Sequence, residues 1–297
     1  MSVDANGKLQ ISQVTAEDWP VVREWAADEG WNPGHEDGSC FLPQDPDGFF
    51  LGRIDGVPVS AVSVVNYGDA YSFLGLYLVR PEFRGRGHGL ATWQHAMPHA
   101  GTRTIGLDGV VARQDDYRRS GFAASHRHVR HVGSVGSVDS IGSVGSIDVV
   151  AEPGRPAKIR PVADIALEEI TAYDGQCFPA ERPAFLKRWL TAPGHHALGI
   201  ATGGRLTGYG VIRPARHAHR IGPLFADSPA DAGALITALA GAVGEFAIDV
   251  PDDNPAALAL MAVLGMKPVF EVARMYTGPI RLTRRERVYG VTSLELG

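Results

Sequence analysis

The sequence predicts a mixed α/β fold (an α+β arrangement around a mixed sheet) made of two similar units in tandem. Three observations support this prediction. Residues 9–132 alternate apolar strand-like segments with amphipathic helical ones, residues 133–148 are rich in glycine and serine, and residues 155–297 restart the same order of strands and helices. Repetition of one pattern on either side of a linker-like segment indicates two related domains.

The first unit opens with a predicted strand over residues 9–14. Thr15 to Asp18 then forms a helix cap, and an amphipathic run follows it as far as Gly30. Residues 31–50 are rich in proline, glycine and aspartate, which favours a loop or short helical turns. Long irregular segments in compact domains are often functional. Three successive strands are expected from Phe49 to Val79, joined by tight turns.

A glycine-rich turn follows the third of these strands and leads into a helix, with glycines at 85, 87 and 89 and arginines at 84 and 86. A helix N-terminus presents free backbone N–H groups and partial positive charge, and arginine donates forked hydrogen bonds to phosphate oxygens. The turn therefore predicts a phosphorylated ligand. Its spacing fits neither the Walker loop nor the dinucleotide fingerprint. A plain surface turn or an RNA-binding arginine–glycine patch is the alternative, and an acidic chain offers little of the basic surface that RNA needs.

Arg84, Gly87 and Gly89 fill the signature R/Q-x-x-G-x-G/A. With the preceding YLVRPEFRG, this stretch resembles the acyl-CoA pyrophosphate loop of the GNAT superfamily of N-acetyltransferases. The resemblance implies acetyl-CoA as the donor substrate and, in each unit, a mostly antiparallel sheet whose fourth and fifth strands splay apart to receive the pantetheine arm. It also implies a donor-binding set of Tyr77, Leu78, Val79, Arg84, Gly85, Arg86, Gly87, His88, Gly89 and Leu90.

The remaining elements complete the order expected of that family. A helix from Leu90 is broken near Pro98, residues 103–107 form a buried strand, and a short helix from Arg113 to Ser120 stops at Gly121. A last strand ends near residue 132. We therefore expect a catalytic domain over residues 1–132, a Gly/Ser-rich linker over 133–154, in which an edge strand is the alternative, and a second domain over 155–297.

The second domain is expected to be degenerate for CoA. The loop after its fourth strand, ADSPADAGAL, lacks both the arginine and the G-x-G spacing of the first. As a whole, the second domain resembles the closing domain of tandem GNAT proteins, which end, as here, in a stretch such as YGVTSLELG.

Tyr117 is the predicted general acid. DDYRRSGF places it four residues before Gly121, which resembles the Yx3GF ending that this family often uses to protonate the departing thiolate. The alternative is a tyrosine that only packs. In the second unit Met261 takes the corresponding place, and a thioether cannot donate a proton.

The base is open at this point. Removing a proton from an ammonium acceptor suits a carboxylate. Candidates are Glu36, Asp37 and Asp108, and His35 and Asp69 are further candidates. The first-helix region covers the acceptor pocket in GNAT folds, which implies Trp31 and Asn32 on the substrate side.

Composition limits the remaining possibilities. A net charge of -5 and a pI of 6.1 give no general attraction to nucleic acid or anionic membranes. We expect no spanning helix, no metal site, and two reduced cysteines in a cytoplasmic protein, either monomer or homodimer. The expected activity is direct transfer of an acetyl group to the primary amine of a small molecule. The alternatives are a non-catalytic acyl-CoA-binding protein and a transferase that uses a longer acyl donor.

Overall fold

The computed structural model describes residues 7–134, 147–152, 155–241 and 243–297. The first half follows the predicted order of strands and helices. Its elements are β1 (Leu9–Gln13), α1 (Trp19–Asp28), α2 (Asp37–Phe41), β2 (Phe49–Ile54), β3 (Val57–Tyr67), β4 (Tyr71–Val79), α3 (His88–Ala96), β5 (Thr104–Val110), α4 (Gln114–Arg119) and β6 (Ala123–Gly133). The break in the helix near Pro98 is a change from α3 to a 3-10 turn, Met97–Ala100.

The second half repeats this order and then adds a strand that the sequence pattern did not predict. Its elements are β7 (Ile147–Glu152), β8 (Arg155–Pro161), α5 (Leu167–Cys177), α6 (Pro183–Trp189), β9 (His196–Thr202), β10 (Arg205–Arg213), β11 (His219–Ala226), α7 (Pro229–Ala240), β12 (Phe246–Pro251), α8 (Pro255–Val263), β13 (Lys267–Tyr276) and β14 (Val288–Gly290). Strand β7 lies within the predicted linker, where an edge strand was the alternative, and it pairs with β8 at one end of the sheet. The remaining linker residues, 135–146 and 153–154, lie outside the described part.

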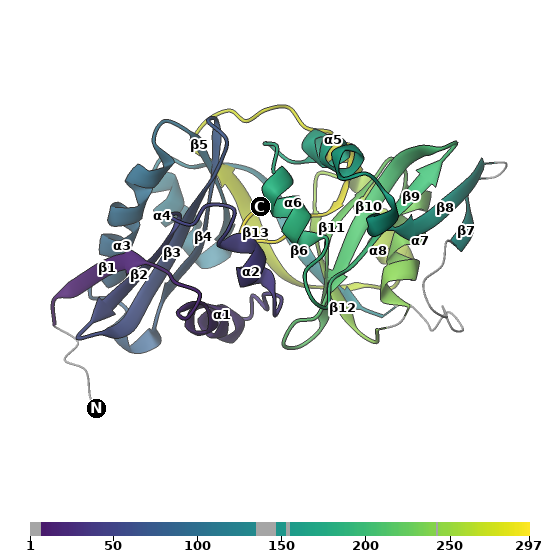
Figure 1. Cartoon of the computed structure of the whole chain (residues 1–297). Helices are drawn as coiled ribbons and strands as arrows, with labels where there is room; N and C mark the ends of the chain where they lie inside the picture. Colours follow the sequence, from purple (N-terminus) through teal and green to yellow (C-terminus); the bar gives the residue numbers. More distant parts are fainter. Residues whose placement is uncertain (1–6, 135–146, 153–154, 242) are drawn as a thin grey trace.

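All strands belong to one sheet, whose order is β1-β2-β3-β4-β5-β13-β6-β12-β11-β10-β9-β8-β7, with β14 paired to β11. The two halves exchange their sixth strands. Strand β13 pairs antiparallel with β5 of the first half, and β6 pairs antiparallel with β12 of the second (Figure 1). In each unit the fifth strand (β5 or β12) therefore has the fourth strand of its own unit on one side and a strand from the other half of the chain on the other side.

This exchange joins the two expected domains in space. The predicted domain 1–132 does not complete its own sheet, because residues 267–276 lie between β5 and β6. Hydrophobic periodicity predicts where strands form but not which strands pair, so the sequence pattern could not distinguish an exchanged sheet from two separate ones.

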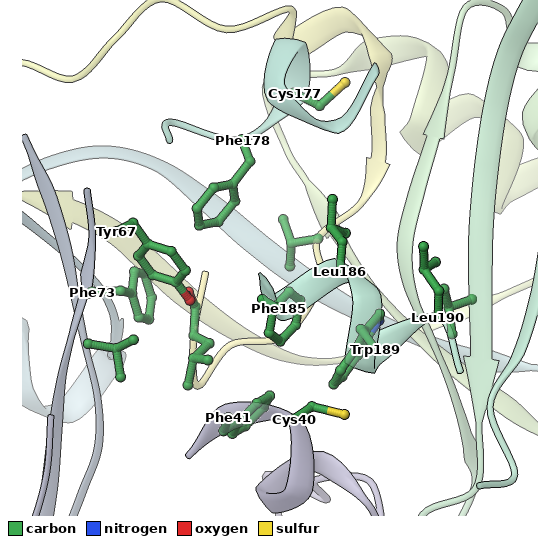
Figure 2. Close-up of a cluster of buried hydrophobic side chains, with 14 of the residues drawn as sticks. Cys40, Phe41, Tyr67, Phe73, Cys177, Phe178, Phe185, Leu186, Trp189 and Leu190 are labelled. Atoms are coloured by element: carbon green, nitrogen blue, oxygen red, sulfur yellow. The ribbon is translucent and has the colours of Figure 1, made fainter. Parts of the chain in front are cut away.

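The two units also share a hydrophobic core (Figure 2). Phe41 of α2 stacks on Trp189 of α6 with ring centroids 5.9 Å apart, and Tyr67 of β3 meets Phe178 edge-on at 5.0 Å. Cys40 and Cys177 are buried free thiols in the same cluster. Because both units contribute to this core, its burial stabilises their relative placement as well as each unit.

Candidate active site

The turn between β4 and α3, residues 80–87, adopts the conformation that its glycines permit. Gly85 and Gly87 have φ values of 75° and 84°, in the left-handed region, and Gly87 is the N-cap of α3. A Cβ atom on Gly89 would lie only 2.7 Å from Val79 Cγ2 and 2.9 Å from Tyr77 Oη. Glycine at position 89 thus lets the first turn of α3 approach β4, which brings the helix N-terminus to the end of that strand.

Arg84 is held in place at this turn. Its Nε donates a hydrogen bond to the Val79 carbonyl oxygen at 2.9 Å, and its guanidinium pairs with Glu29, just after α1. Arg84 lines the cleft beside the turn, whereas Arg86 is exposed and is not among the residues that line it. The two arginines of the motif therefore have different surroundings.

Strands β4 and β5 splay apart, as expected. They pair in parallel only from Tyr71 opposite Thr104 to Leu74 opposite Leu107. On its other edge β5 pairs with β13 from Gly106 to Val110, while β4 bulges away from β5. The stretch Gly75–Leu78 of β4 runs opposite Ala61–Ser63 of β3, one residue longer, and Leu76 has a φ of 49°. Bulges and positive φ at a non-glycine residue recur beside functional sites, where they redirect backbone groups.

Two adjoining cavities lie where β4 and β5 separate. A cleft of about 710 Å³ runs along the turn and the N-terminus of α3, and a smaller cavity of about 40 Å³ lies in the slot between β4 and β5. Four residues line both cavities: Trp31, Tyr77, Val110 and Tyr117. The cleft and the slot are therefore neighbouring parts of one site.

Tyr117, from α4, lies at this junction. Its ring stacks on Trp93 of α3 with centroids 5.9 Å apart. Burial raises the pKa of its phenol to about 12, so the hydroxyl keeps its proton at neutral pH. A protonated phenol between the two cavities can act as a proton donor there.

Asp108 also lines the slot, but its charge is already neutralised. Its side chain is fully buried, and Arg274 donates to both of its oxygens at 2.8 Å. His128 Nδ1 lies 3.0 Å away. Although burial alone would raise it, the Arg274 guanidinium and the neighbouring His128 ring hold the pKa of Asp108 far below its usual range. A carboxylate with so little affinity for a proton is a poor base, which argues against the predicted role.

The other predicted acceptor-side residues lie in different places. Asp37 is buried between the units, where it accepts from Arg213 Nε at 2.8 Å and from the Gly34 N–H at 2.8 Å. Asn32 bridges to the Ala218 carbonyl oxygen at 3.3 Å and accepts from the His217 N–H at 3.2 Å. Glu36 is half-buried and lines neither cavity. Of this group only Trp31 faces the site.

Sequence reasoning missed several residues that line the site. Glu29, Arg113 and Arg119 line the cleft, and Glu295 lines the slot. Glu295 comes from the segment after β14, which no sequence pattern connects with the first unit. The sequence did hold one signal: Glu295 is an acidic residue between two leucines, Leu294 and Leu296. If such a residue is buried, its carboxylate normally has a partner or a function.

The corresponding region of the second unit is closed by the chain itself. Strands β11 and β12 pair in parallel only from His219 opposite Phe246 to Ile221 opposite Ile248. In the gap beyond them, β14 pairs with β11 at Leu224 opposite Gly290 and Phe225 opposite Val288. Only residues 227 and 228 connect β11 to α7, and Asp231 puts a carboxylate in the first turn of that helix.

Among the helices of the described residues, none is both long enough and apolar enough to cross a bilayer. Within the same residues, no three or more His, Cys, Asp or Glu side chains are grouped so that they could hold a metal ion.

Family models and known proteins match both units. The model described as "Acetyltransferase (GNAT) family" matches residues 11–123, and one described as "Acetyltransferase (GNAT) domain" matches residues 170–290. A holothin acyltransferase from Pseudoalteromonas sp. (strain SANK 73390) is 31% identical over 284 residues, which cover 95% of this chain and 92% of that protein.

Solved structures share the fold over nearly the whole chain. A putative acetyltransferase from Pyrococcus horikoshii is 22% identical, with a TM-score of 0.77 over 97% of this chain and 96% of the other. A tandem GNAT protein from the clavulanic acid biosynthesis pathway is 17% identical, with a TM-score of 0.61 over 92% and 99%. The chain belongs to the GNAT family: it is a tandem GNAT acyltransferase, and GNAT enzymes take their acyl group from an acyl-CoA donor.

Proposed function

We propose that the first unit binds acetyl-CoA and transfers its acetyl group to the primary amine of a small molecule, by direct attack while both substrates are bound. One observation carries this proposal. The cleft beside the glycine-rich turn passes Tyr77 and Tyr117 and adjoins the slot between β4 and β5. A donor held by its phosphates at the turn would reach the slot with its thioester end.

The donor end is recognised by backbone and charge. The N–H groups at the start of α3 and the Arg84 guanidinium would hold the pyrophosphate, while the bulged backbone of Tyr77 to Val79 would hold the pantetheine arm and the acyl oxygen. The slot of about 40 Å³ has room for about three water molecules. That space favours an acetyl group over a long acyl chain.

The acceptor is proposed from the slot and from the relative. The similar protein is named for acylating holothin, so holothin itself is one candidate acceptor for this chain. Polyamines, amino sugars and amino acids or antibiotics that carry an amine remain the other classes. A tyrosine that stays protonated beside the slot supports the remaining step, in which Tyr117 gives its proton to the departing thiolate of CoA.

We further propose that the second unit binds no CoA. The supporting observations are the short connection before α7, the carboxylate of Asp231 in its first turn, and the pairing of β14 with β11 where a pantetheine arm would lie. Met261, fully buried at the place of Tyr117, has no proton to donate.

The test is release of free thiol from acetyl-CoA with a panel of holothin, a polyamine, an amino sugar and amino acids. We expect acylated product with one class, and a lower kcat/KM with succinyl-CoA and longer donors. Absence of turnover with every amine, in a protein that binds CoA, would contradict the proposal. A higher kcat/KM with a longer donor would contradict the assignment of acetyl-CoA alone.

A further inference from the structure

The segment after β14 links the two units and ends against the first. The Tyr67 hydroxyl, on β3, donates to the Leu296 carbonyl oxygen at 3.0 Å, and the Leu296 side chain is fully buried. The backbone of Glu295 lies directly on Gly75 of β4: a Cβ there would come within 2.0 Å of the Glu295 carbonyl oxygen. Residues 293–297 are thus fixed at the point where β4 leaves β5.

Glu295 is a buried carboxylate without a hydrogen-bond partner. The residue is 2% exposed, and neither Oε1 nor Oε2 has a partner among the described residues. It lines the slot together with Gly75, Leu76 and Tyr117. Burying an unpaired carboxylate is costly, so a residue of this kind beside a cavity indicates a ligand that supplies the missing partner.

The arginines near Glu295 bond to other carboxylates, although the Nε of Arg220 has no hydrogen-bond partner among the described residues. Arg130 of β6 and Arg220 of β11 both bond to Asp249, and Arg213 of β10 bonds to Asp37. Burial raises the pKa of Glu295, Asp37 raises it further, and the three arginines oppose the rise without cancelling it. The other titratable groups that line the slot are Asp108, which is paired with Arg274, and the phenols of Tyr77 and Tyr117.

We propose that Glu295 is the general base that receives the ammonium group of the acceptor in this slot. The proposal rests on the acyltransferase function proposed above and adds the residue that the sequence left open. Glu295 is the carboxylate of the slot that no arginine holds, whereas Asp108 and Asp37 are each held by a buried arginine. An acceptor ammonium would supply the hydrogen-bond donor that both Glu295 oxygens lack.

The proton and electron transfers balance with the groups present. The ammonium gives one proton to the Glu295 carboxylate, and the freed lone pair forms a C–N bond to the thioester carbon. The C–S bond then breaks, and its electron pair leaves on sulfur. The thiolate takes a proton from Tyr117, which recovers one from the nitrogen. The products are the N-acyl amine and free CoA, and Glu295 returns its proton to water.

The test is Glu295→Gln in the full chain, assayed with the amine that the wild type acylates. We expect kcat/KM for the amine to fall about 10²-fold while the Kd for acetyl-CoA, measured by calorimetry, stays unchanged. The wild-type rate should fall as the pH drops through the raised pKa of Glu295, because the protonated form cannot accept a proton. The variant should lack this acidic limb.

Two further variants separate a base from a structural residue. Glu286→Gln changes an exposed glutamate in the 3-10 turn just before β14, which pairs with Arg284, and should leave the rate and its pH profile unchanged. Glu295→Asp keeps a carboxylate and should keep the acidic limb with a reduced rate. Because glutamine has nearly the same shape as glutamate, the Glu295→Gln variant should keep the wild-type far-UV circular dichroism spectrum.

The outcomes distinguish this proposal from the proposed function. If no amine is acylated by the wild type, the proposed function fails first. If the wild type is active and Glu295→Gln keeps its rate and acidic limb, Glu295 is not the base although the function stands. A loss of rate accompanied by an altered circular dichroism spectrum and weaker CoA binding would assign Glu295 a structural role, which also overturns the proposal.

Discussion

Tyr117 shows how burial fixes the resting protonation state of a single residue. With its pKa raised to about 12, the phenol is almost entirely protonated at every pH at which the enzyme would be assayed. It therefore enters the reaction in the protonated form, with a proton to give. Its stacking on Trp93 keeps the ring between cleft and slot, where a departing thiolate would need the proton.

Tyr117→Phe should lower kcat by about 10²-fold with little change in the Kd for acetyl-CoA, because it removes the proton donor and keeps the ring. Steady-state kinetics and calorimetry measure the two quantities. Since the pKa is raised, Tyr117 should contribute no limb to the pH profile until about pH 12, and the variant should keep the profile's shape. Tyr289→Phe is the matched control, because burial also raises the pKa of Tyr289 to about 12 but this tyrosine packs in the second unit. An unchanged kcat for Tyr117→Phe would leave Tyr117 a packing residue.

The carboxylates show what the sequence could not predict at this scale. Asp37, Asp108 and Glu295 are all buried acidic side chains, and they differ in the partners that the fold gives them. Two of those partners, Arg213 and Arg274, are more than 160 positions away in the chain. No local pattern carries that information, so the sequence pointed to Asp37 and Asp108 as candidates for the base and missed Glu295.

The turn between β4 and α3 is the element that the sequence predicted best. Each of its glycines has a local reason, either a positive φ or the close approach of Gly89 to Tyr77, and local reasons are visible in a motif. The structure adds that Arg84 also braces the turn through the Val79 carbonyl oxygen and Glu29.

Arg84→Ala should weaken acetyl-CoA binding by about tenfold or more, because charge-assisted hydrogen bonds contribute about 1.5 to 3 kcal/mol each. Calorimetry with acetyl-CoA measures the change. Arg80→Ala is the control: Arg80 lies in the same turn, pairs with Glu82 and does not line the cleft. Equal losses in both variants would mean that general positive charge, rather than the position of Arg84, governs binding.

Strand β14 illustrates the opposite case. Three residues are too few to show a period, and nothing in VYG indicates that it pairs with β11. The exchange of β6 and β13 could not be predicted either, although each strand was correctly expected, because no local pattern shows which strands pair. Strand existence is a local property of the sequence, whereas strand pairing depends on the whole chain.

Because β14 occupies the second slot, calorimetric titration should give one acetyl-CoA per chain. Pairing of β14 with β11 uses the backbone groups that a second pantetheine arm would need. Arg84→Ala with Gly87→Val should then abolish all saturable binding. A stoichiometry of two, or binding that survives the double variant, would show that the second unit is competent.

At the scale of the whole molecule, one sheet and one shared core should make the two units unfold together. Strands β6 and β13 cannot leave one unit without leaving the other. Urea unfolding followed by far-UV circular dichroism and by tryptophan fluorescence should therefore give coincident transitions. Two separated transitions would indicate that each unit is stable without the strand it receives.

The buried ion pair of Asp37 with Arg213 joins the two units, and its contribution to the free energy of unfolding can be measured. Both side chains are buried, so removing either leaves an uncompensated charge at the junction. Asp37→Asn and Arg213→Gln should each lower the free energy of unfolding by about 3 to 5 kcal/mol, and the double variant should lose less than their sum. Urea unfolding of the four proteins gives the coupling. The exposed pair Arg118 with Asp115 is the control, and its removal should cost about 1 kcal/mol or less. Additive losses at Asp37 and Arg213 would mean that the shared hydrophobic core alone, without this ion pair, fixes the first unit against the second.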